Sequence, residues 1–306
     1  MPNLKDIRRR IKSVKSTQKI TQAMRMVSAA KVKRAEGRLK AAKPYLQTLR
    51  ALVSDVSERL AQAPDLLAKA KYGAMLSGSA ARAVKTIGMV VISSDRGLCG
   101  AYNTNVIRAA LHQKKTYEAQ GVTVKLYLVG NKAIQTFARL GVQETDLIGR
   151  MANMTAAPSV ADARLVTDNL IEAYQTGLID QVVVHSTLFK SLISYQVEQT
   201  SLIPTQPVSA AAAAPEKRAT TAELLLEPSP QAVLDGLMPM YLQQTLYGML
   251  LEAATSELAA RMTAMANASS NASDMLNRLT LVYNKARQSS ITQEILEVVS
   301  GAEALR

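Results

Sequence analysis

The sequence predicts an α/β domain carried between two long terminal helices that pair as an antiparallel coiled coil. Both ends of the chain contain long stretches without glycine or proline, whereas the middle alternates β-rich apolar runs with helical stretches. Aromatic residues make up only 4% of the chain and tryptophan is absent, which favours helices whose backbones approach closely. With 306 residues and 48% hydrophobic side chains, the chain is able to bury a substantial core.

Residues 1–62 are predicted to form the N-terminal helix of the coiled coil. Neither proline nor glycine occurs between Pro2 and Gly37, and apolar or small side chains recur there at three-four spacing. This spacing predicts one helical seam made of Leu4, Ile7, Ile11, Val14, Gln18 and Thr21.

The seam is expected to drift along the helix and then to continue past two helix-breaking residues. The drift passes through Ile20, Met24 and Val27. Beyond Gly37 and Pro44, a second apolar series follows the same spacing. That series contains Leu46, Leu49, Leu52, Val53, Val56 and Leu60.

Residues 231–306 are predicted to form the C-terminal helix of the coiled coil, because 52 consecutive residues between Gly248 and Gly301 lack glycine and proline. The polar patch from Asn267 to Asp274 interrupts its apolar stripe. The stripe consists of Leu251, Ala254, Leu258, Met262, Met265, Leu276, Leu279, Tyr283 and Ala286. Two such amphipathic helices bury their seams only against each other or against a partner.

Residues 63–230 are predicted to form an α/β foot domain with a mostly parallel sheet and flanking helices. An extended run at Ile193–Leu202 predicts an additional edge strand, and the low-complexity segment 205–221 is expected to be a mobile loop. The predicted strands are Ile87–Ser93, Val122–Val129 and Gln181–Ser186, and the predicted helices lie near 104–119, 131–140 and 159–177.

Positive charge is concentrated in the first helix. The chain has a formal charge of +13, and residues 1–50 hold fifteen lysines and arginines against two acids, Asp6 and Glu36. No apolar run approaches the roughly 18 residues needed to cross a bilayer, and no signal-peptide core precedes the first helix. The single cysteine, Cys99, cannot form an internal disulfide and fits a reducing compartment.

One glycine-rich segment, Ser94–Gly100, follows a predicted strand and precedes a helix, which is where α/β folds often bind phosphate. It lacks the lysine and hydroxyl of a P-loop and does not match GxGxxG, so a structural turn is favoured over a nucleotide site. Cys99 is interpreted as a structural thiol, and His112 and His185 have no partners at metal-ligand spacing. We therefore expect no catalytic residue, cofactor or metal.

The basic helix allows two interpretations. A lysine- and arginine-rich coiled coil has the charge of a nucleic-acid-binding protein, which remains the alternative function. However, its charge extends along most of the helix without interleaved aromatics, unlike a basic-zipper protein. A long acidic protein surface is the favoured partner.

Four blocks of sequence resemble the gamma subunits of rotary F-type ATP synthases. The longest is Ile291–Ala304, which fits the pattern I-T-x-E-x-x-[DE]-x-x-x-G-A. The others occur in the family's order: Ser16–Met24, Asp95–Gly100 and Tyr283–Gln288.

This resemblance implies a non-catalytic central shaft that couples proton translocation to conformational changes of the catalytic beta subunits. The implied partners are three alpha and three beta subunits, the epsilon subunit and the membrane-embedded ring of c subunits, with one shaft per complex. The membrane is reached only through partners. No transit peptide precedes the family-like start, so the expected location is the cytoplasmic side of a bacterial plasma membrane.

The resemblance also implies roles for particular residues. The contacts with the beta subunit would be made by Arg287, Gln288, Thr292 and Glu294 on the C-terminal helix and by Met24 and Lys31 on the N-terminal helix. The basic excess of residues 8–43 would complement an acidic segment of the beta subunit. An apolar tip turning in a hydrophobic sleeve would contain Val298, Val299, Ala302 and Leu305. Contact with the ring, less firmly implied, would involve Glu223, Leu224, Leu226 and Glu227. Photosynthetic relatives carry a cysteine-containing regulatory insertion near the end of the foot domain. The segment 205–221 here contains no cysteine, so no thiol regulation of that kind is expected.

Overall fold

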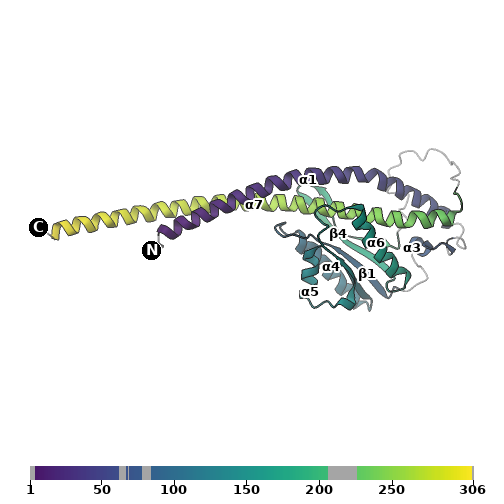
Figure 1. Cartoon of the computed structure of the whole chain (residues 1–306). Helices are drawn as coiled ribbons and strands as arrows, with labels where there is room; N and C mark the ends of the chain where they lie inside the picture. The colour runs from purple at the N-terminus through teal and green to yellow at the C-terminus, as the bar shows by residue number, and fades with distance from the viewer. Residues whose placement is uncertain (1–3, 62–66, 68, 78–83, 206–225, 305–306) are drawn as a thin grey trace. The chain divides into compact units, whose positions relative to one another are not determined.

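The computed structural model describes residues 4–61, 67, 69–77, 84–205 and 226–304 (Figure 1). Two compact units make up the chain. The first, called here the paired-helix unit, contains residues 1–30 and 261–306. The second, called the sheet unit, contains residues 31–260.

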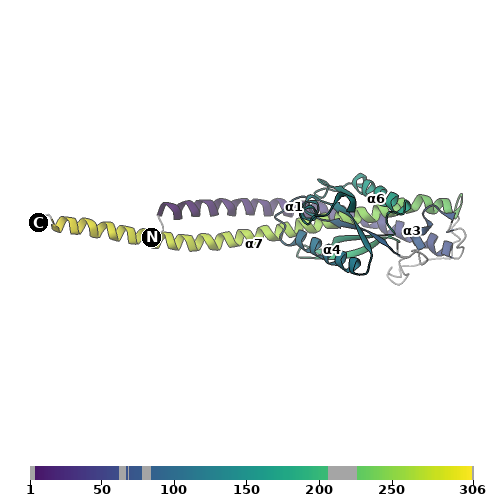
Figure 2. The ribbon, with the colours of Figure 1, turned by 90° about the horizontal axis from the view of Figure 1, so that it is seen from below.

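The paired-helix unit consists of the start of α1 (Leu4–Ala61) and the end of α7 (Pro230–Ala304). The two helical segments lie side by side in both views, with their chain ends on the same side, so they are antiparallel (Figures 1 and 2). A hydrogen bond from Gln18 Nε2 to Ser273 Oγ, 2.9 Å long, joins them. The seam buries Ile7, Thr21, Ser28, Met265 and Ala272.

The predicted drift of the N-terminal seam is wrong. Ile20 and Val27 are 57% and 55% exposed, whereas Thr21 and Ser28 are buried. The buried positions keep the 3.5-residue period of a coiled coil, which takes the seam through Thr21 and Ser28 even though both are polar. Small side chains at these positions permit close approach of the two backbones.

The polar patch from Asn267 to Asp274 does not interrupt the packing of α7. Within it Ala272 is 8% exposed, and Ser273 accepts the bond from Gln18. The patch therefore replaces part of the apolar seam by one small buried residue and one hydrogen bond between the helices.

The sheet unit contains a five-stranded sheet of order β3-β2-β1-β4-β5. The first four strands are parallel, and β5 runs antiparallel to β4 at one edge. The strands are β1 (Thr86–Ile92), β2 (Thr123–Val129), β3 (Leu147–Met151), β4 (Gln181–Ser191) and β5 (Ser194–Ile203). The mostly parallel sheet and the edge strand are thus confirmed.

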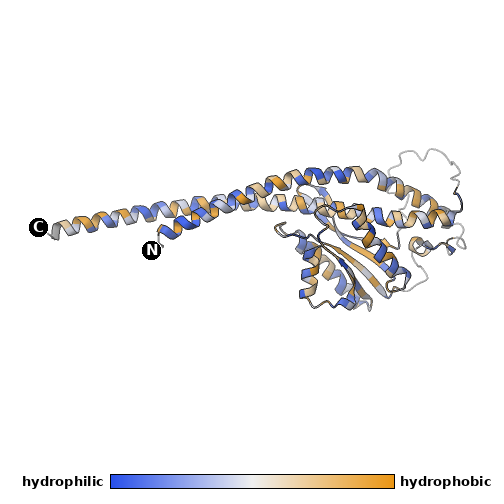
Figure 3. Ribbon diagram, in the orientation of Figure 1, coloured by the Kyte–Doolittle hydropathy of each residue, from blue (hydrophilic) through white to orange (hydrophobic). Residues whose placement is uncertain are grey.

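Helices cover both faces of the sheet. Alternate β1 side chains point to opposite faces, as the strand period requires: Met89 and Val91 pack with α4 and α5, whereas Val90 and Ile92 pack with α6, α1 and α7. Apolar residues follow the strands of this covered sheet in Figure 3. The helices and the short helical turn are α3 (Gly73–Ser77), α4 (Tyr102–Ala119), α5 (Asn131–Arg139), η1 (Glu144–Asp146) and α6 (Val160–Gln175).

Both long helices continue through a proline. Pro44 lies inside α1 and Pro239 inside α7, although an interior proline removes a backbone hydrogen bond and costs about 3 kcal/mol. Around Pro239, Leu234, Met238 and Leu242 are fully buried in the core beside the sheet, and this burial offsets the loss.

The start of α7 lies one residue before the predicted start of the C-terminal helix at residue 231. Ser229 Oγ accepts a hydrogen bond from the Ala232 backbone N–H, and Pro230 occupies the first helical position, where its missing N–H costs nothing. Proline here begins a helix that then has 75 residues.

Sequence patterns did not predict β3. It has only five residues, at the sheet edge, and lies partly exposed. Gly149 within it weakens the strand pattern, but a Cβ atom at this position would lie 2.7 Å from Cε2 of Tyr127 on β2. Glycine is therefore required by the close approach of the Tyr127 ring.

His185 on β4 is a buried histidine, 3% exposed, between β1 and β5. Its Nε2 atom has no hydrogen-bond partner among the described residues. Burial lowers its pKa to about 4 from 6.5, because the charged imidazolium loses its hydration inside the core.

We expect acid to destabilise the chain through this residue. Between pH 6.5 and 4 the unfolded chain binds a proton at His185 and the folded chain does not, so stability falls as pH drops. The free energy of unfolding should fall by about 2 kcal/mol between pH 7 and pH 5 from this group alone. Urea unfolding at both pH values measures it. His185→Gln should remove this part of the pH dependence and the matched variant His112→Gln should retain it; equal slopes for both variants would contradict the assignment.

Candidate partner-binding surfaces

The end of α7 is a bare helix. Every residue from Ile291 to Ala302 is exposed, whereas the preceding positions Ser289 and Ser290 are still half-buried. Figures 1 and 2 show the C-terminal end of α7 extending past the N-terminal end of α1. The paired-helix unit therefore ends in a single helix, so its cross-section there is not symmetric.

An apolar stripe runs along this bare helix. Ile291, Ile295 and Val298 are 48%, 57% and 72% exposed, and their spacing of four and three residues places them on one face together with Ala302. Val299, at 54%, lies beside the stripe. Val298, Val299 and Ala302 were predicted as part of an apolar tip. Ile291 and Ile295 were not predicted, although their spacing of four and three residues from Val298 places them on the same face. Leu305 lies outside the described residues.

The four polar candidates on α7 are all exposed, but they form two groups. Arg287 and Glu294 are seven residues apart and share one face, next to the apolar stripe. Gln288 and Thr292 share a neighbouring face, where Thr292 Oγ1 donates a 2.9 Å hydrogen bond to the Gln288 carbonyl. Ser290 Oγ donates a 3.3 Å hydrogen bond to Glu294 Oε1. One partner loop reaching all four must wrap partly around the helix.

A basic surface covers α1 in the paired-helix unit. Its eight lysines and arginines within residues 4–30 are all exposed, against a single acid, Asp6, which pairs with Arg9 at 3.3 Å. Met24 is half-buried beside the seam. Exposed apolar side chains interrupt the basic surface at Ile20, Met26 and Val27. In the sheet unit, Lys31 on the same helix is also exposed.

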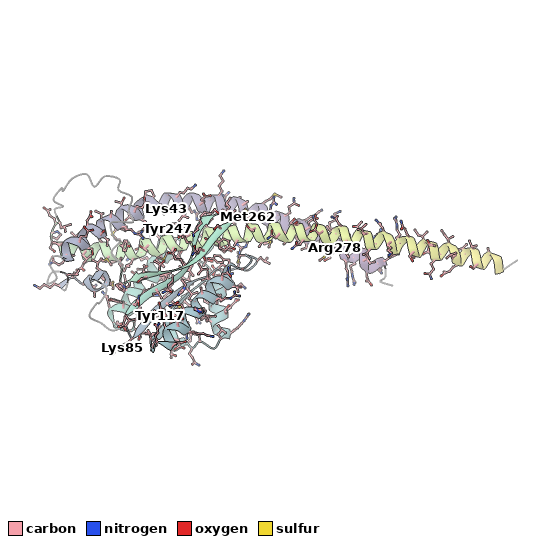
Figure 4. The ribbon with its side chains drawn as sticks, turned by 180° about the vertical axis from the view of Figure 1, so that it is seen from behind. Lys43, Lys85, Tyr117, Tyr247, Met262 and Arg278 are labelled. Carbon is pink, nitrogen blue, oxygen red and sulfur yellow. The ribbon has the colours of Figure 1, made fainter. Side chains whose placement is uncertain are left out.

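Side chains project from all sides of α7 in the paired-helix unit, where Arg278 and Met262 are labelled in Figure 4. Arg278 is exposed and Met262 is half-buried.

Only part of the predicted ring-contacting segment lies within the described residues. Glu223 and Leu224 lie outside them, as does most of the predicted loop 205–221. Leu226 is half-buried and packs against the core beside the sheet, whereas Glu227 is exposed.

The Ser94–Gly100 loop is tied to its neighbours by one carboxylate, that of Asp95. Asp95 accepts hydrogen bonds from the backbone N–H groups of Asn131, Asn153 and Thr155 at 3.0, 2.8 and 3.0 Å and from Thr155 Oγ1 at 2.7 Å. These donors follow β2 and β3, so Asp95 joins the loops at the carboxyl ends of three strands. Burial alone would raise the pKa of Asp95, but the four hydrogen bonds outweigh it and hold the pKa below its ordinary value.

The same contacts argue against phosphate binding at this loop. A phosphate at the carboxyl edge of the sheet needs free backbone N–H groups at a helix N-terminus. The Asn131 N–H at the start of α5 already donates to Asp95, whose negative charge would repel an anion. Cys99 is 2% exposed, and its sulfur accepts from Asn103 Nδ2 at 3.1 Å, which agrees with a structural thiol.

Among the described residues, no cluster of three or more histidine, cysteine, aspartate or glutamate side chains has the arrangement of a metal site. None of the helices in the described part of the chain has a segment long and apolar enough to span a bilayer.

A family model described as ATP synthase matches residues 3–305. The ATP synthase gamma chain of Synechococcus sp. (strain PCC 6716) is 42% identical over 331 aligned residues, with 100% of both chains covered. The chain belongs to the ATP synthase gamma chain family. Another member, from Nostoc punctiforme, is 40% identical over 330 aligned residues with the same full coverage.

Solved structures show the same fold as this gamma-family chain. The central-stalk chain of the Tetrahymena thermophila mitochondrial ATP synthase has a TM-score of 0.57 at 25% identity, covering 82% of this chain and 99% of its own length. A rotor chain of the Euglena gracilis enzyme has a TM-score of 0.64 at 19% identity, covering 94% and 98%. The predicted family and fold class are confirmed.

Replacing the carboxylate of Asp95 should lower the stability of the sheet unit. Asp95→Asn leaves one acceptor oxygen and turns an amide N–H₂ toward N–H donors, so we expect a loss of about 1–3 kcal/mol in the free energy of unfolding. Asp168→Asn is the matched control, because its exposed 3.5 Å pair with Arg164 is worth under about 0.5 kcal/mol.

Urea unfolding followed by circular dichroism measures both variants. Because the pKa of Asp95 is lowered in the folded chain, its stabilisation is present above the ordinary carboxyl pKa of 3.8 and is lost as pH falls through the folded value. The difference between Asp95→Asn and the parent should therefore shrink on acidification. If the two substitutions cost the same at pH 7, Asp95 does not hold the loops together.

Proposed function

We propose that this chain is the central rotor shaft of an F-type ATP synthase, coupling proton translocation through the membrane ring to conformational cycling of the catalytic beta subunits. Family membership supports this proposal, as does the central-stalk position of the Tetrahymena chain. The structural feature that carries it is the bare end of α7, from Ile291 to Ala302, with its apolar stripe exposed to a partner. This membership favours a rotor over the nucleic-acid-binding alternative.

An asymmetric shaft acts on its partners through contacts that change as it rotates. A partner subunit changes its conformational equilibrium only if its contacts with the shaft differ between its states. The bare end of α7 presents apolar side chains on one face and the Gln288–Thr292 pair on another. Rotation of such a helix presents different chemistry to each of three surrounding beta subunits in turn.

The expected partners divide by chemistry. The exposed basic residues on the first part of α1 suit an acidic surface of the beta subunits, and such rim charges mainly set the rate and salt dependence of association. The apolar tip, including Val298 and Val299, suits a hydrophobic sleeve formed by alpha and beta subunits. The sheet unit is proposed to reach the epsilon subunit and the c-subunit ring, with Glu227 among its ring contacts.

Several parts of the proposal concern the complex rather than the chain. The chain is proposed to be non-catalytic, with one copy per complex and nucleotide chemistry confined to its partners. It is proposed to sit peripherally on the cytoplasmic side of a bacterial plasma membrane and to reach the membrane through its partners. Asp95 accepts hydrogen bonds from neighbouring loops, and Cys99 is buried. Both observations support the proposal that the glycine-rich loop catalyses no reaction.

Subunit stoichiometry tests the rotor proposal. The affinity-tagged chain, purified from native membranes in mild detergent, should bring down alpha and beta subunits in a ratio of one to three to three, measured by native mass spectrometry. A tagged chain recovered without alpha and beta subunits, or bound to nucleic acid instead, would sink the proposal.

The polar contacts near the tip have their own prediction. Arg287→Ala combined with Gln288→Ala removes exposed side chains without touching the core, so the chain should assemble normally. Loss of one or two contacts of about 1–3 kcal/mol at a partner surface predicts roughly a tenfold fall in ATP-driven proton pumping by the assembled complex. Exposed Arg139→Ala on α5 is the control and should leave pumping unchanged. Unaltered pumping in the double variant would show that these side chains do not transmit torque.

A further inference from the structure

A groove of 570 Å³ lies between α4 and α5 on the outer side of the sheet unit. Its floor is apolar, formed by Ile107, which is 7% exposed, and half-buried Leu111. Its walls are polar or basic and contain Asn103, Thr104, Arg108, His112, Lys115, Lys132 and Thr136. Figure 1 shows α4 and α5 next to each other on the sheet.

The described lysine and arginine side chains that line this groove make it positively charged. Arg108, Lys115 and Lys132 line it, and none of the described lining residues is acidic. None of these three cations forms an ion pair within the part of the chain that the structure describes. The nearest basic neighbour in sequence behaves differently, because Lys114 pairs with Glu118 outside the groove. Three unpaired cations around an apolar floor form a surface that favours an amphipathic acidic ligand.

The shape of the groove narrows the choice of ligand. It follows α4 from Asn103 to Lys115, a length of about 18 Å at 1.5 Å per residue, which is several times the width of a phosphate group. Its described lining residues include no phenylalanine, tyrosine or tryptophan on which a nucleic-acid base could stack. A helical segment of protein matches both the length and the apolar floor.

The spacing of the cations specifies the occupant further. Arg108 and Lys115 are seven residues apart on α4, about 10.5 Å, while Lys132 stands across the groove on α5. Carboxylates seven residues apart on a docked helix would lie at the same separation. Apolar side chains between them would cover Ile107 and Leu111.

We propose that the α4–α5 groove docks an acidic amphipathic helix of another subunit of the same complex. This inference rests on the proposed rotor function for the identity of the complex, but the chemistry of the groove stands by itself. The docked helix gives the chain an attachment point on the sheet unit, separate from the bare tip of α7 in the paired-helix unit. It ties the partner to the rotor through Arg108, Lys115 and Lys132.

Site-specific photo-crosslinking in the assembled complex tests this proposal. A benzoylphenylalanine introduced at His112, an exposed groove position, should crosslink on irradiation to an acidic helical peptide of another subunit, identified by mass spectrometry. The same photoreactive residue at exposed Lys85, which is labelled in Figure 4 and does not line the groove, should not label that peptide. No crosslink, or labelling of lipid, nucleic acid or a peptide without acidic residues, would overturn the proposal.

Reversing the charge of groove residues provides a second test of the proposal. Arg108→Glu with Lys115→Glu should lower the crosslink yield at His112 about tenfold, because the two new carboxylates would repel an acidic helix docked in the groove. Lys69→Glu with Lys71→Glu makes the same change in net charge at exposed positions outside the groove and should leave the yield unchanged. Equal yields in both variants would refute an electrostatic groove. Copurification with alpha and beta subunits, scored in the same preparations, separates failure of the groove from failure of the rotor assignment.

Discussion

The buried seam between the two ends of the chain is the constraint on which the paired-helix unit depends. An isolated amphipathic helix gains little stability in water, so the first 27 described residues of α1 require the end of α7 as a partner. Their seam contains few large apolar side chains: Thr21, Ser28 and Ala272 are buried, and Gln18 bonds to Ser273. Small seam residues permit close packing but contribute less hydrophobic stabilisation than leucine. Such a pair leaves much of its apolar surface, including Ile20 and Val27, available to an enclosing partner.

The sheet unit obtains its rigidity differently. Large apolar side chains fill both sides of its sheet, and α1 and α7 contribute Leu49, Val53 and Leu246 to the same core. Many α/β proteins bind ligands at the carboxyl ends of their strands. In this chain the carboxylate of Asp95 accepts the hydrogen bonds of the backbone N–H groups there. The carboxyl edge of this mostly parallel sheet therefore holds loops together.

Periodicity predicted the large features of the fold because they are repeated over many residues. The three-four spacing at both ends and the apolar runs of β1, β2 and β4 each identified an element, and β5 was expected at the edge. Predictions at single residues were wrong or missing: Gly149 concealed β3 by making room for Tyr127, and Ile20 lies outside the seam. Tertiary packing decides these positions, and no local pattern records it. The proposed partner-contacting residues were selected by resemblance, whereas the α4–α5 groove could be found only once the structure placed the two helices side by side.

Distance measurement across the seam tests the account most directly. Spin labels at exposed Thr17 and Asp274, next to the bonded Gln18 and Ser273, leave the seam intact, and Cys99→Ser removes the natural thiol. Packed helices lie 8–10 Å apart, so pulsed electron resonance on the full chain should give one narrow distance distribution centred below about 25 Å. A broad distribution centred beyond about 40 Å would mean that the two ends of the chain do not pack together, and would contradict the paired seam and the rotor shaft built on it.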